Sequence, residues 1–245
     1  MSIPYARICY LFRLRSGGLW GSGRRYLEAD VVTVEQKYGD KIVPCIPHTY
    51  VKGLIRRTLE RLEPLLIKAG IISRTITRDL FGFMPSIERS DYSKPSVLPS
   101  KIICGPALPI PNVSVAEELS KLEPMNYISS KHILDKDSIA YYVEPHVRIL
   151  DSSHRVSIGG LFHEYKVAPL QIFYGEILVY EQERALLIEY CRAILVSLVY
   201  LNYLYVGRAT TTADVAIINI KPNDLIQDPV ISQIFNERNF RRMTS

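Results

Sequence analysis

Two segments of helical length constrain the fold of this 245-residue chain more than any other feature. In residues 49–62, apolar side chains recur every three or four positions, which is the spacing of one buried helix face. Thr49 belongs to the residue types that cap helix N-termini, and Pro64 is expected to kink or restart the helix near its end. Residues 181–205 are apolar on most faces, which predicts a second and largely buried helix.

Short segments rich in β-branched and aromatic residues surround these helices and predict strands. The predicted strands are residues 3–14, 26–34, 100–104, 140–150, 169–180 and 213–220. Helices interleaved with strands in this order predict an α+β fold, with a ferredoxin-like or RRM-like sheet that carries helices on one face. We expect one domain over residues 1–245, with insertions at about 79–99 and 106–165 and a β-hairpin around 150–165.

Smaller features complete the predicted order of elements. A glycine-rich loop is expected at residues 16–25 and a tight turn at 38–41. The polar, proline-punctuated residues 79–99 predict another loop. Short helices are expected near residues 116–122 and in the tail after residue 224.

The composition narrows the class of protein. Hydrophobic residues make up 47%, which is enough for a sizeable core, and the net charge of +5 permits binding to a polyanion without requiring it. The cysteines Cys9, Cys45, Cys104 and Cys191 lie far apart, without the spacing of a zinc site or a disulfide framework. The longest apolar run, 193–206, is shorter than the roughly 20 residues of a membrane span. We therefore expect a cytoplasmic protein with no membrane partner.

Residues 46–56, which read IPHTYVKGLIR, combine features that suit a phosphate backbone. A helix N-terminus offers free N–H groups to a phosphate, and Gly53 lets a ligand backbone approach closely. Lys52 and Arg56 lie four residues apart on one flank and add positive charge. The same pattern also fits an ordinary surface helix with solvated basic side chains, so this segment alone leaves both interpretations open.

This segment resembles the I-P-G-S-S-L-K-G-x-x-R segment of the RAMP superfamily, in particular of backbone subunits of type III CRISPR effector complexes (the Csm and Cmr types). Two further segments follow it in the family order. Residues 79–82 read DLFG, where the family has a leucine-phenylalanine-glycine, and residues 98–104 read LPSKIIC, where the family opens its next strand.

The most specific resemblance lies further along the chain. Residues 147–155 read VRILDSSHR and are similar to the family pattern R-I-D-R-x-T. Residues 160–169, GLFHEYKVAP, and 173–177, FYGEI, resemble the patterns L-F-x-x-E-x-V-P and F-x-G-x-I. In the family this region is the thumb, a β-hairpin that wedges into the duplex of guide and target RNA.

The resemblance implies a subunit that binds guide RNA and target RNA together with other RAMP-type subunits in one complex. Contacts to phosphates would make this binding largely independent of base sequence. The RNA-binding residues that it implies are Gly17, Gly18, Arg24, Arg25, His48, Thr49, Lys52, Gly53, Arg56, Arg148, His154 and Arg155.

Three departures from the family pattern keep alternatives open. His48 stands where the family usually has glycine, Leu150 is inserted before Asp151, and residues 205–212 hold one glycine where relatives often have several. The chain is therefore also compatible with a diverged, non-catalytic paralogue that fills one unique slot in the complex. A third alternative is a protein-interaction domain with no role in RNA binding.

The resemblance also raises the question of catalysis. In the family, an aspartate in the loop before the I-P-G segment cleaves target RNA with a divalent metal, which can act on the attacking 2′-OH or the phosphate. Asp30 fits this position best, and Glu28, Glu35 and Asp40 are the other acidic residues upstream of the segment. If Asp30 is catalytic, Mg²⁺ is the expected cofactor; otherwise none is expected. The glycine-rich C-terminal loop of the family's guide-processing enzymes is missing, which makes that activity a weaker alternative.

Overall fold

A computed structural model describes residues 5–21, 31–83, 98–149, 156–207 and 211–235. Its main sheet is built from β1 (Tyr5–Leu14), β5 (Ile102–Cys104), β9 (Ile172–Tyr180) and β10 (Ala213–Lys221) in the order β10-β1-β9-β5. Each neighbouring pair is antiparallel. A short strand, β6 (Leu108–Ile110), continues the β5 edge by pairing with the start of β9.

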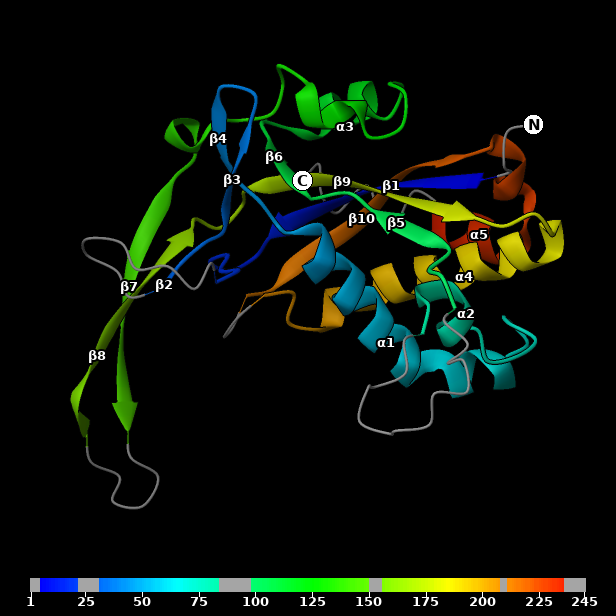
Figure 1. Ribbon diagram of the computed structural model, residues 1–245, viewed down its shortest axis with the longest axis horizontal. Helices are drawn as coiled ribbons and strands as arrows, with labels where there is room; N and C mark the ends of the chain where they lie inside the picture. Colours follow the sequence, from blue (N-terminus) through cyan, green and yellow to red (C-terminus); the bar gives the residue numbers. More distant parts are fainter. Residues whose placement is uncertain (1–4, 22–30, 84–97, 150–155, 208–210, 236–245) are drawn as a thin grey trace, which may run out of the picture.

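Two long helices cover one face of this sheet (Figure 1). α1 (His48–Lys68) lies between β1 and β5 in the sequence, and α4 (Arg184–Tyr200) lies between β9 and β10. The order β1-α1-β5-β9-α4-β10, together with the sheet order, is the ferredoxin-like arrangement. The predicted α+β fold is therefore confirmed.

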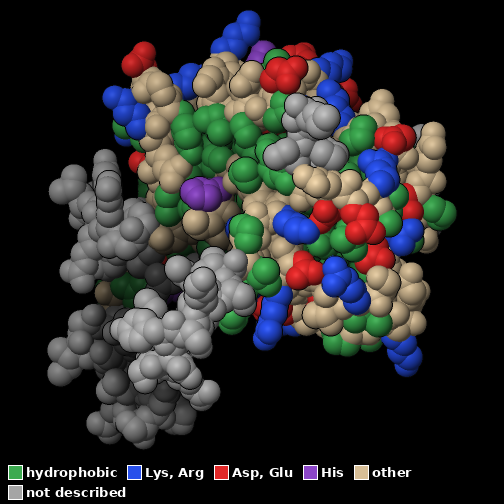
Figure 2. All heavy atoms as spheres, turned by 45° about the vertical axis from the view of Figure 1, so that its right-hand side comes forward, with side chains coloured by type: hydrophobic (Ala, Val, Ile, Leu, Met, Phe, Trp, Pro, Cys, Tyr) green, Lys and Arg blue, Asp and Glu red, His purple; other side chains and the backbone are tan. Residues whose placement is uncertain are grey.

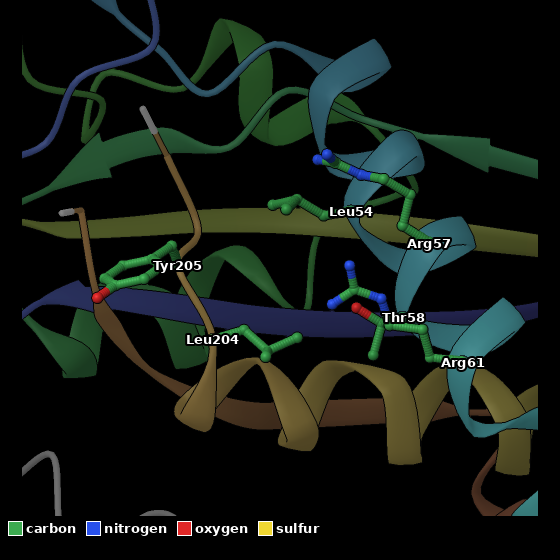
Figure 3. A pocket seen from close by; sticks show the side chains of 6 residues that line it. All are labelled: Leu54, Arg57, Thr58, Arg61, Leu204 and Tyr205. Carbon is green, nitrogen blue, oxygen red and sulfur yellow. The ribbon is translucent and has the colours of Figure 1, made fainter. Parts of the chain in front are cut away.

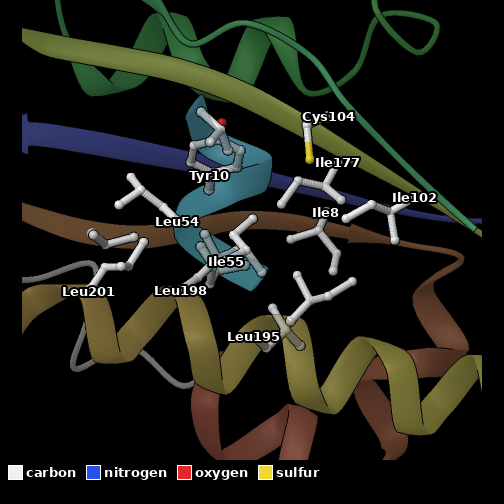
Figure 4. Close-up of a cluster of buried hydrophobic side chains, with 14 of the residues drawn as sticks. Ile8, Tyr10, Leu54, Ile55, Ile102, Cys104, Ile177, Leu195, Leu198 and Leu201 are labelled. Atoms are coloured by element: carbon white, nitrogen blue, oxygen red, sulfur yellow. The ribbon is translucent and has the colours of Figure 1, made fainter. Parts of the chain in front are cut away.

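The main core lies between the two helices and the sheet. Figure 4 shows Ile8 and Tyr10 of β1 facing Leu54 and Ile55 of α1 and Leu198 of α4. All of these side chains are at most 5% exposed. The apolar residues whose spacing predicted the first helix thus form the buried face of α1.

The opposite face of the sheet is also covered. β1 alternates, so Cys9 and Leu11 point away from the long helices into a second core. This core is closed by α3 (Val113–Leu119) and by the 3-10 turn η1 (Asn126–Ser129). A second 3-10 turn, η2 (Lys136–Ser138), follows and contributes no side chain to this core. The sequence predicted helices on one face, and the structure adds this small layer on the other (Figure 1).

A buried ion pair ties the second layer to the sheet. Arg7 of β1 pairs with Glu176 of β9, and both side chains are at most 2% exposed. Arg7 also donates to the carbonyl oxygens of Leu119 (3.4 Å) and Ser120 (3.2 Å) at the end of α3, while the backbone N–H of Met125 donates to Glu176 (2.9 Å). Because buried charges are tolerated only when they are paired and hydrogen-bonded, this network fixes where α3 ends.

A β-hairpin projects from the body of the molecule (Figure 1). It is formed by β7 (Tyr141–Ile149) and β8 (Val156–Val167), and β2 (Val31–Val32) pairs with β8 in parallel. The predicted hairpin insertion is therefore present, although no strand was predicted over the range of β8.

The remaining elements are short. β3 (Glu35–Tyr38) and β4 (Lys41–Pro44) form the hairpin whose turn was predicted, with Gly39 at a positive φ of 59°. α2 (Thr77–Phe81) follows α1. The last described elements are η3 (Leu201–Tyr203), η4 (Asn223–Gln227) and α5 (Pro229–Phe235).

Several local predictions need correction. Thr49 does not cap α1, because the helix begins at His48 and Pro47 is the capping residue. α1 continues through Pro64 to Lys68 instead of restarting there. The start of the expected loop at 79–99 belongs to α2, and residues 84–97 of that loop lie outside the described residues.

The apolar character of α4 is explained by its place in the core. By length and mean hydropathy (1.5), the stretch Arg184–Tyr203 would be able to cross a membrane, and half of its apolar window is buried inside the fold. Leu195 and Leu198 contribute to the main core against the sheet. This packing agrees with the expected buried helix.

Candidate nucleic-acid interface

The first residues of α1 lie at the surface of the molecule. His48 and Thr49 are exposed, and no described side chain caps the helix N-terminus. The first turn contains no acidic residue. Free N–H groups and the positive end of the helix dipole therefore face solvent.

Lys52, Gly53 and Arg56 lie on the next two turns of the same surface. Lys52 Nζ donates to Ser100 Oγ at 2.7 Å, and Arg56 Nε lies 2.9 Å from Glu60 Oε1 with both side chains about half exposed. Exposed pairs of this kind contribute little to stability, so both cations can exchange their partners for a ligand. The structure thus brings three of the predicted site residues onto one surface.

Gly53 has open space in front of it. A Cβ built on this residue meets no atom within 4 Å, although Gly53 lies inside a helix. Glycine in a helix interior costs roughly 0.5–1 kcal/mol relative to alanine. The packing of the described residues does not explain why this position holds a glycine.

Sequence reasoning missed a neighbouring hollow of about 200 Å³ between α1 and the chain that follows α4 (Figure 3). Arg57 and Arg61 of α1 lie on one side of it, and Leu204 and Tyr205 lie on the other. The four-residue spacing of the two arginines was visible in the sequence. Their proximity to Tyr205 was not, because it depends on where α4 ends.

Gly17 and Gly18, which were predicted to bind RNA, lie at the base of the projecting hairpin. Both are buried, and a Cβ on Gly17 would lie 1.8 Å from Tyr142 Oη. The N–H of Gly18 donates to the carbonyl oxygen of Val167 at 2.9 Å, and the reverse bond has the same length. These glycines pack against the base of the projecting hairpin, and their place in an RNA groove stays a prediction.

Other predicted site residues are not placed with the α1 surface. Arg24, Arg25, His154 and Arg155 lie outside the described residues. Arg148 belongs to β7, and its side chain is outside the described part of the structure.

The candidate catalytic residue Asp30, like Glu28, lies outside the described residues. Of the other acidic candidates, Glu35 lies in β3, where Tyr141 Oη donates to it at 3.5 Å, and Asp40 is exposed in the β3–β4 turn. Within the described ranges, no group of three His, Cys, Asp or Glu residues is arranged to hold a metal ion. The described residues therefore do not fit a Mg²⁺ site, and we derive no cleavage step from them.

The projecting hairpin carries a charged cluster on one face. Lys166 bridges Glu144 and Glu164, and His146 Nε2 lies 3.0 Å from Glu164 Oε2 without the geometry of a hydrogen bond. The hydrogen bond from Lys166 holds the pKa of Glu144 below its ordinary value of 4.5. The cluster therefore stiffens the hairpin near its base.

The other face of the hairpin is apolar and exposed. Val143, Val147 and Leu161 are 42%, 50% and 59% exposed. The hairpin thus has one charged face and one apolar, exposed face.

The four cysteines are buried and unbonded. Burial raises the pKa of the Cys9 thiol to about 11 and the pKa values of Cys45, Cys104 and Cys191 to about 12. Neutral, buried thiols are poor nucleophiles, so these residues contribute to packing.

Acidic and basic side chains alternate on one face of the molecule. On the face in Figure 2, acidic and basic side chains are interspersed over the right-hand part of the molecule. The net charge of +5 permits polyanion binding without requiring it.

Comparison of the sequence with protein-family models and with curated proteins gives no match. Among solved structures, the chain is similar to one in a cryo-EM structure of type III-B Cmr-beta in the apo state. The two share 13% sequence identity, with a TM-score of 0.45, over 76% of this chain and 88% of that chain.

Proposed function

We propose that this protein is a guide-RNA-binding backbone subunit of a type III CRISPR interference complex. It would bind guide RNA, and through the guide a complementary target RNA, beside other RAMP-type subunits. The proposal combines the resemblance of residues 46–56 and 147–177 to that family with the geometry of α1.

One observation carries the proposal: the exposed surface of α1 is arranged for a phosphate backbone. An uncapped helix N-terminus precedes Lys52 and Arg56, and Gly53 between them leaves space for close approach. Exposed contacts such as those of Lys52 and Arg56 add little to the free energy of unfolding. The same two cations would add substantially to the affinity for a polyanion. The surface reads phosphates and not bases, which suits a subunit that must accept any guide sequence.

The site of RNA binding would be this helix surface and not the sheet. RRM domains bind single-stranded RNA on an open sheet face. Here the face opposite the long helices is covered by α3 and its turns, which bury Cys9 and Leu11. The fold resembles an RRM, but the surface proposed to bind RNA is a different one.

The first test removes two cations from the α1 surface. Lys52→Ala combined with Arg56→Ala should weaken RNA binding and lower its salt dependence, by about 0.7 in log–log slope for each phosphate that is no longer neutralised. The matched control is Lys37→Ala with Lys121→Ala, which removes the same charge from exposed positions elsewhere. An unchanged slope in the α1 variant would contradict the assignment of these residues.

The second test is purification of the native protein, followed by mass spectrometry and RNA sequencing. Small RNAs with a shared repeat-derived end, together with several RAMP-like proteins, are the expected result. The stoichiometry would distinguish a repeated subunit from a diverged paralogue in one unique slot. A protein without RNA would favour the alternative of a protein-interaction domain.

Cleavage of target RNA stays a separate prediction. If Asp30 acts with Mg²⁺, Asp30→Asn should abolish cleavage and leave assembly and RNA binding intact. The assay is gel analysis of labelled target RNA with the assembled complex, with and without EDTA. Metal-dependent cleavage that survives this substitution would show that another residue is responsible, with Glu28, Glu35 and Asp40 the next to be tested.

A further inference from the structure

The hollow beside α1 has two chemically different sides. Arg57 and Arg61 are exposed on α1, and Figure 3 shows both guanidinium groups directed toward the side on which Leu204 and Tyr205 lie. Leu54 forms part of the apolar floor. Cationic groups thus face an aromatic ring across a concave surface.

The two guanidinium groups have no acidic partner among the described residues. Arg57 Nε donates to the Gly53 carbonyl oxygen at 3.3 Å, and Arg61 forms no ion pair with a described carboxylate. Like charges four residues apart on a helix repel each other by a few tenths of a kcal/mol. Arg56, by contrast, is paired with Glu60 one turn along. A bound anion would relieve this repulsion, and a phosphate can accept hydrogen bonds from both groups.

The aromatic side is unusually open. Tyr205 is 62% exposed and Tyr203 is 77% exposed, and the Tyr203 ring lies 6.0 Å from that of Tyr200, which is 39% exposed. Single-stranded nucleic acid is bound by such exposed rings next to basic side chains, because every base offers a π-face for stacking. Paired bases in a duplex are already stacked on one another and offer no free face.

We propose that this hollow binds one nucleotide of a single-stranded RNA, with its phosphate at Arg57 and Arg61 and its base stacked on Tyr205. The inference rests on the proposed function and deepens it, since it adds contact with an unpaired base to the phosphate contacts of Lys52 and Arg56.

The experiment compares ordinary single-stranded RNA with an abasic strand of equal length, which keeps the sugar-phosphate backbone and lacks bases. For Tyr205→Leu, affinity for ordinary RNA should fall roughly 5- to 150-fold, the range of aromatic stacking on one base. Its affinity for the abasic strand should equal that of the wild type. Arg57→Gln with Arg61→Gln should weaken binding of both strands, because both carry phosphates.

The control is Tyr5→Leu, which removes another partly exposed tyrosine at the far end of β1. It should leave binding of both strands unchanged. Thermal unfolding of each variant confirms that the fold is retained. A duplex RNA of the same sequence should bind wild type and Tyr205→Leu with equal affinity.

The outcomes separate this inference from the proposed function. If wild type binds RNA and Tyr205→Leu has no effect on ordinary RNA, base stacking is disproved while the phosphate surface stands. Loss of a protein neighbour from the assembly, with RNA affinity unchanged, would likewise overturn the inference and identify a protein-docking surface. If wild type binds no RNA, both proposals fail.

Discussion

At Gly53, one substitution is expected to have opposite effects on stability and on RNA binding. Nothing within 4 Å would obstruct a methyl group there, so Gly53→Ala should raise the free energy of unfolding by roughly 0.5–1 kcal/mol. If RNA passes close to the helix, the same substitution should lower RNA affinity. Chemical denaturation and RNA titration of one protein preparation measure both effects.

The control for this substitution is Gly175→Ala. A Cβ at Gly175 would lie 2.4 Å from Tyr10 Oη in the core, so this variant should lose stability instead of gaining it. A stabilised Gly53→Ala variant with unchanged RNA affinity would mean that the RNA does not approach this turn.

At the same scale, the sequence predicted part of the candidate site. Lys52, Gly53 and Arg56 are partly or fully exposed on one side of α1, because helical spacing is a local property that a sequence records. The hollow at Arg57 and Tyr205 depends on contacts between segments nearly 150 residues apart, which no local pattern encodes. The packing of Gly17 against Tyr142 was not predicted, because a glycine required by a packed tyrosine looks the same in a sequence as one required by a ligand.

At the scale of elements, helix ends depend on individual side chains that sequence patterns locate poorly. α5 is held at its start by Asp228, which accepts from the backbone N–H groups of Val230 (3.2 Å) and Ile231 (3.1 Å). Arg192 of α4 donates to both oxygens of this carboxylate and to the carbonyl oxygen of Ile71. One arginine thus joins α4, α5 and the end of α1.

This arrangement predicts a pH dependence of stability. The hydrogen bond from Arg192 holds the pKa of Asp228 below its ordinary value of 3.8, so the unfolded chain binds the proton more readily than the folded one. The stabilisation is complete above pH 3.8 and is lost as the pH falls through the lower, folded-state value. Asp228→Asn should therefore cost about 1–3 kcal/mol at neutral pH, and the difference from wild type should shrink in acid.

Asp224→Asn is the matched control. Asp224 pairs with Arg184 at 2.6 Å, but both side chains are about half exposed, so its removal should cost less than about 1 kcal/mol. Denaturant unfolding of both variants across the acid range measures the two effects. A constant difference between Asp228→Asn and wild type would show that the carboxylate charge is not the cause.

Strands with apolar buried residues were predicted, whereas a strand with buried charged residues was not. β1, β9 and β10 were located to within a few residues, because β-branched and aromatic runs mark buried strands. No strand was predicted over β8, whose buried residues include Glu164 and Lys166. Their burial depends on pairing with side chains of β7, which a sequence does not reveal.

For the whole molecule, the structure separates a compact body from a projecting arm. The described core residues closest to the arm are Ile139 and Val167, at its base. Joining Val147 to Leu161, which are cross-strand partners, through an Asn-Gly turn should therefore leave the body folded. We expect the melting temperature to change by less than about 4 °C, or roughly 1 kcal/mol for a domain of this size.

A deeper truncation provides the contrast. Removing Glu144, Glu164 and Lys166 with the rest of the arm would also expose the anchor at Gly18 and should destabilise the body. Scanning calorimetry of the two truncations compares them directly. If the shorter truncation already prevents folding, the arm is part of the folding unit and not an appendage.

The place of β1 in the sheet has a consequence for how this chain can diverge. Its two edges are paired with β10 and β9, and its two faces lie in separate cores. On either face of β1, a polar side chain needs a buried partner, as Arg7 has in Glu176, whereas exposed positions of α1 tolerate polar substitutions more freely. Among distant relatives, β1 should therefore be the segment that still aligns when the surfaces that distinguish their roles no longer do.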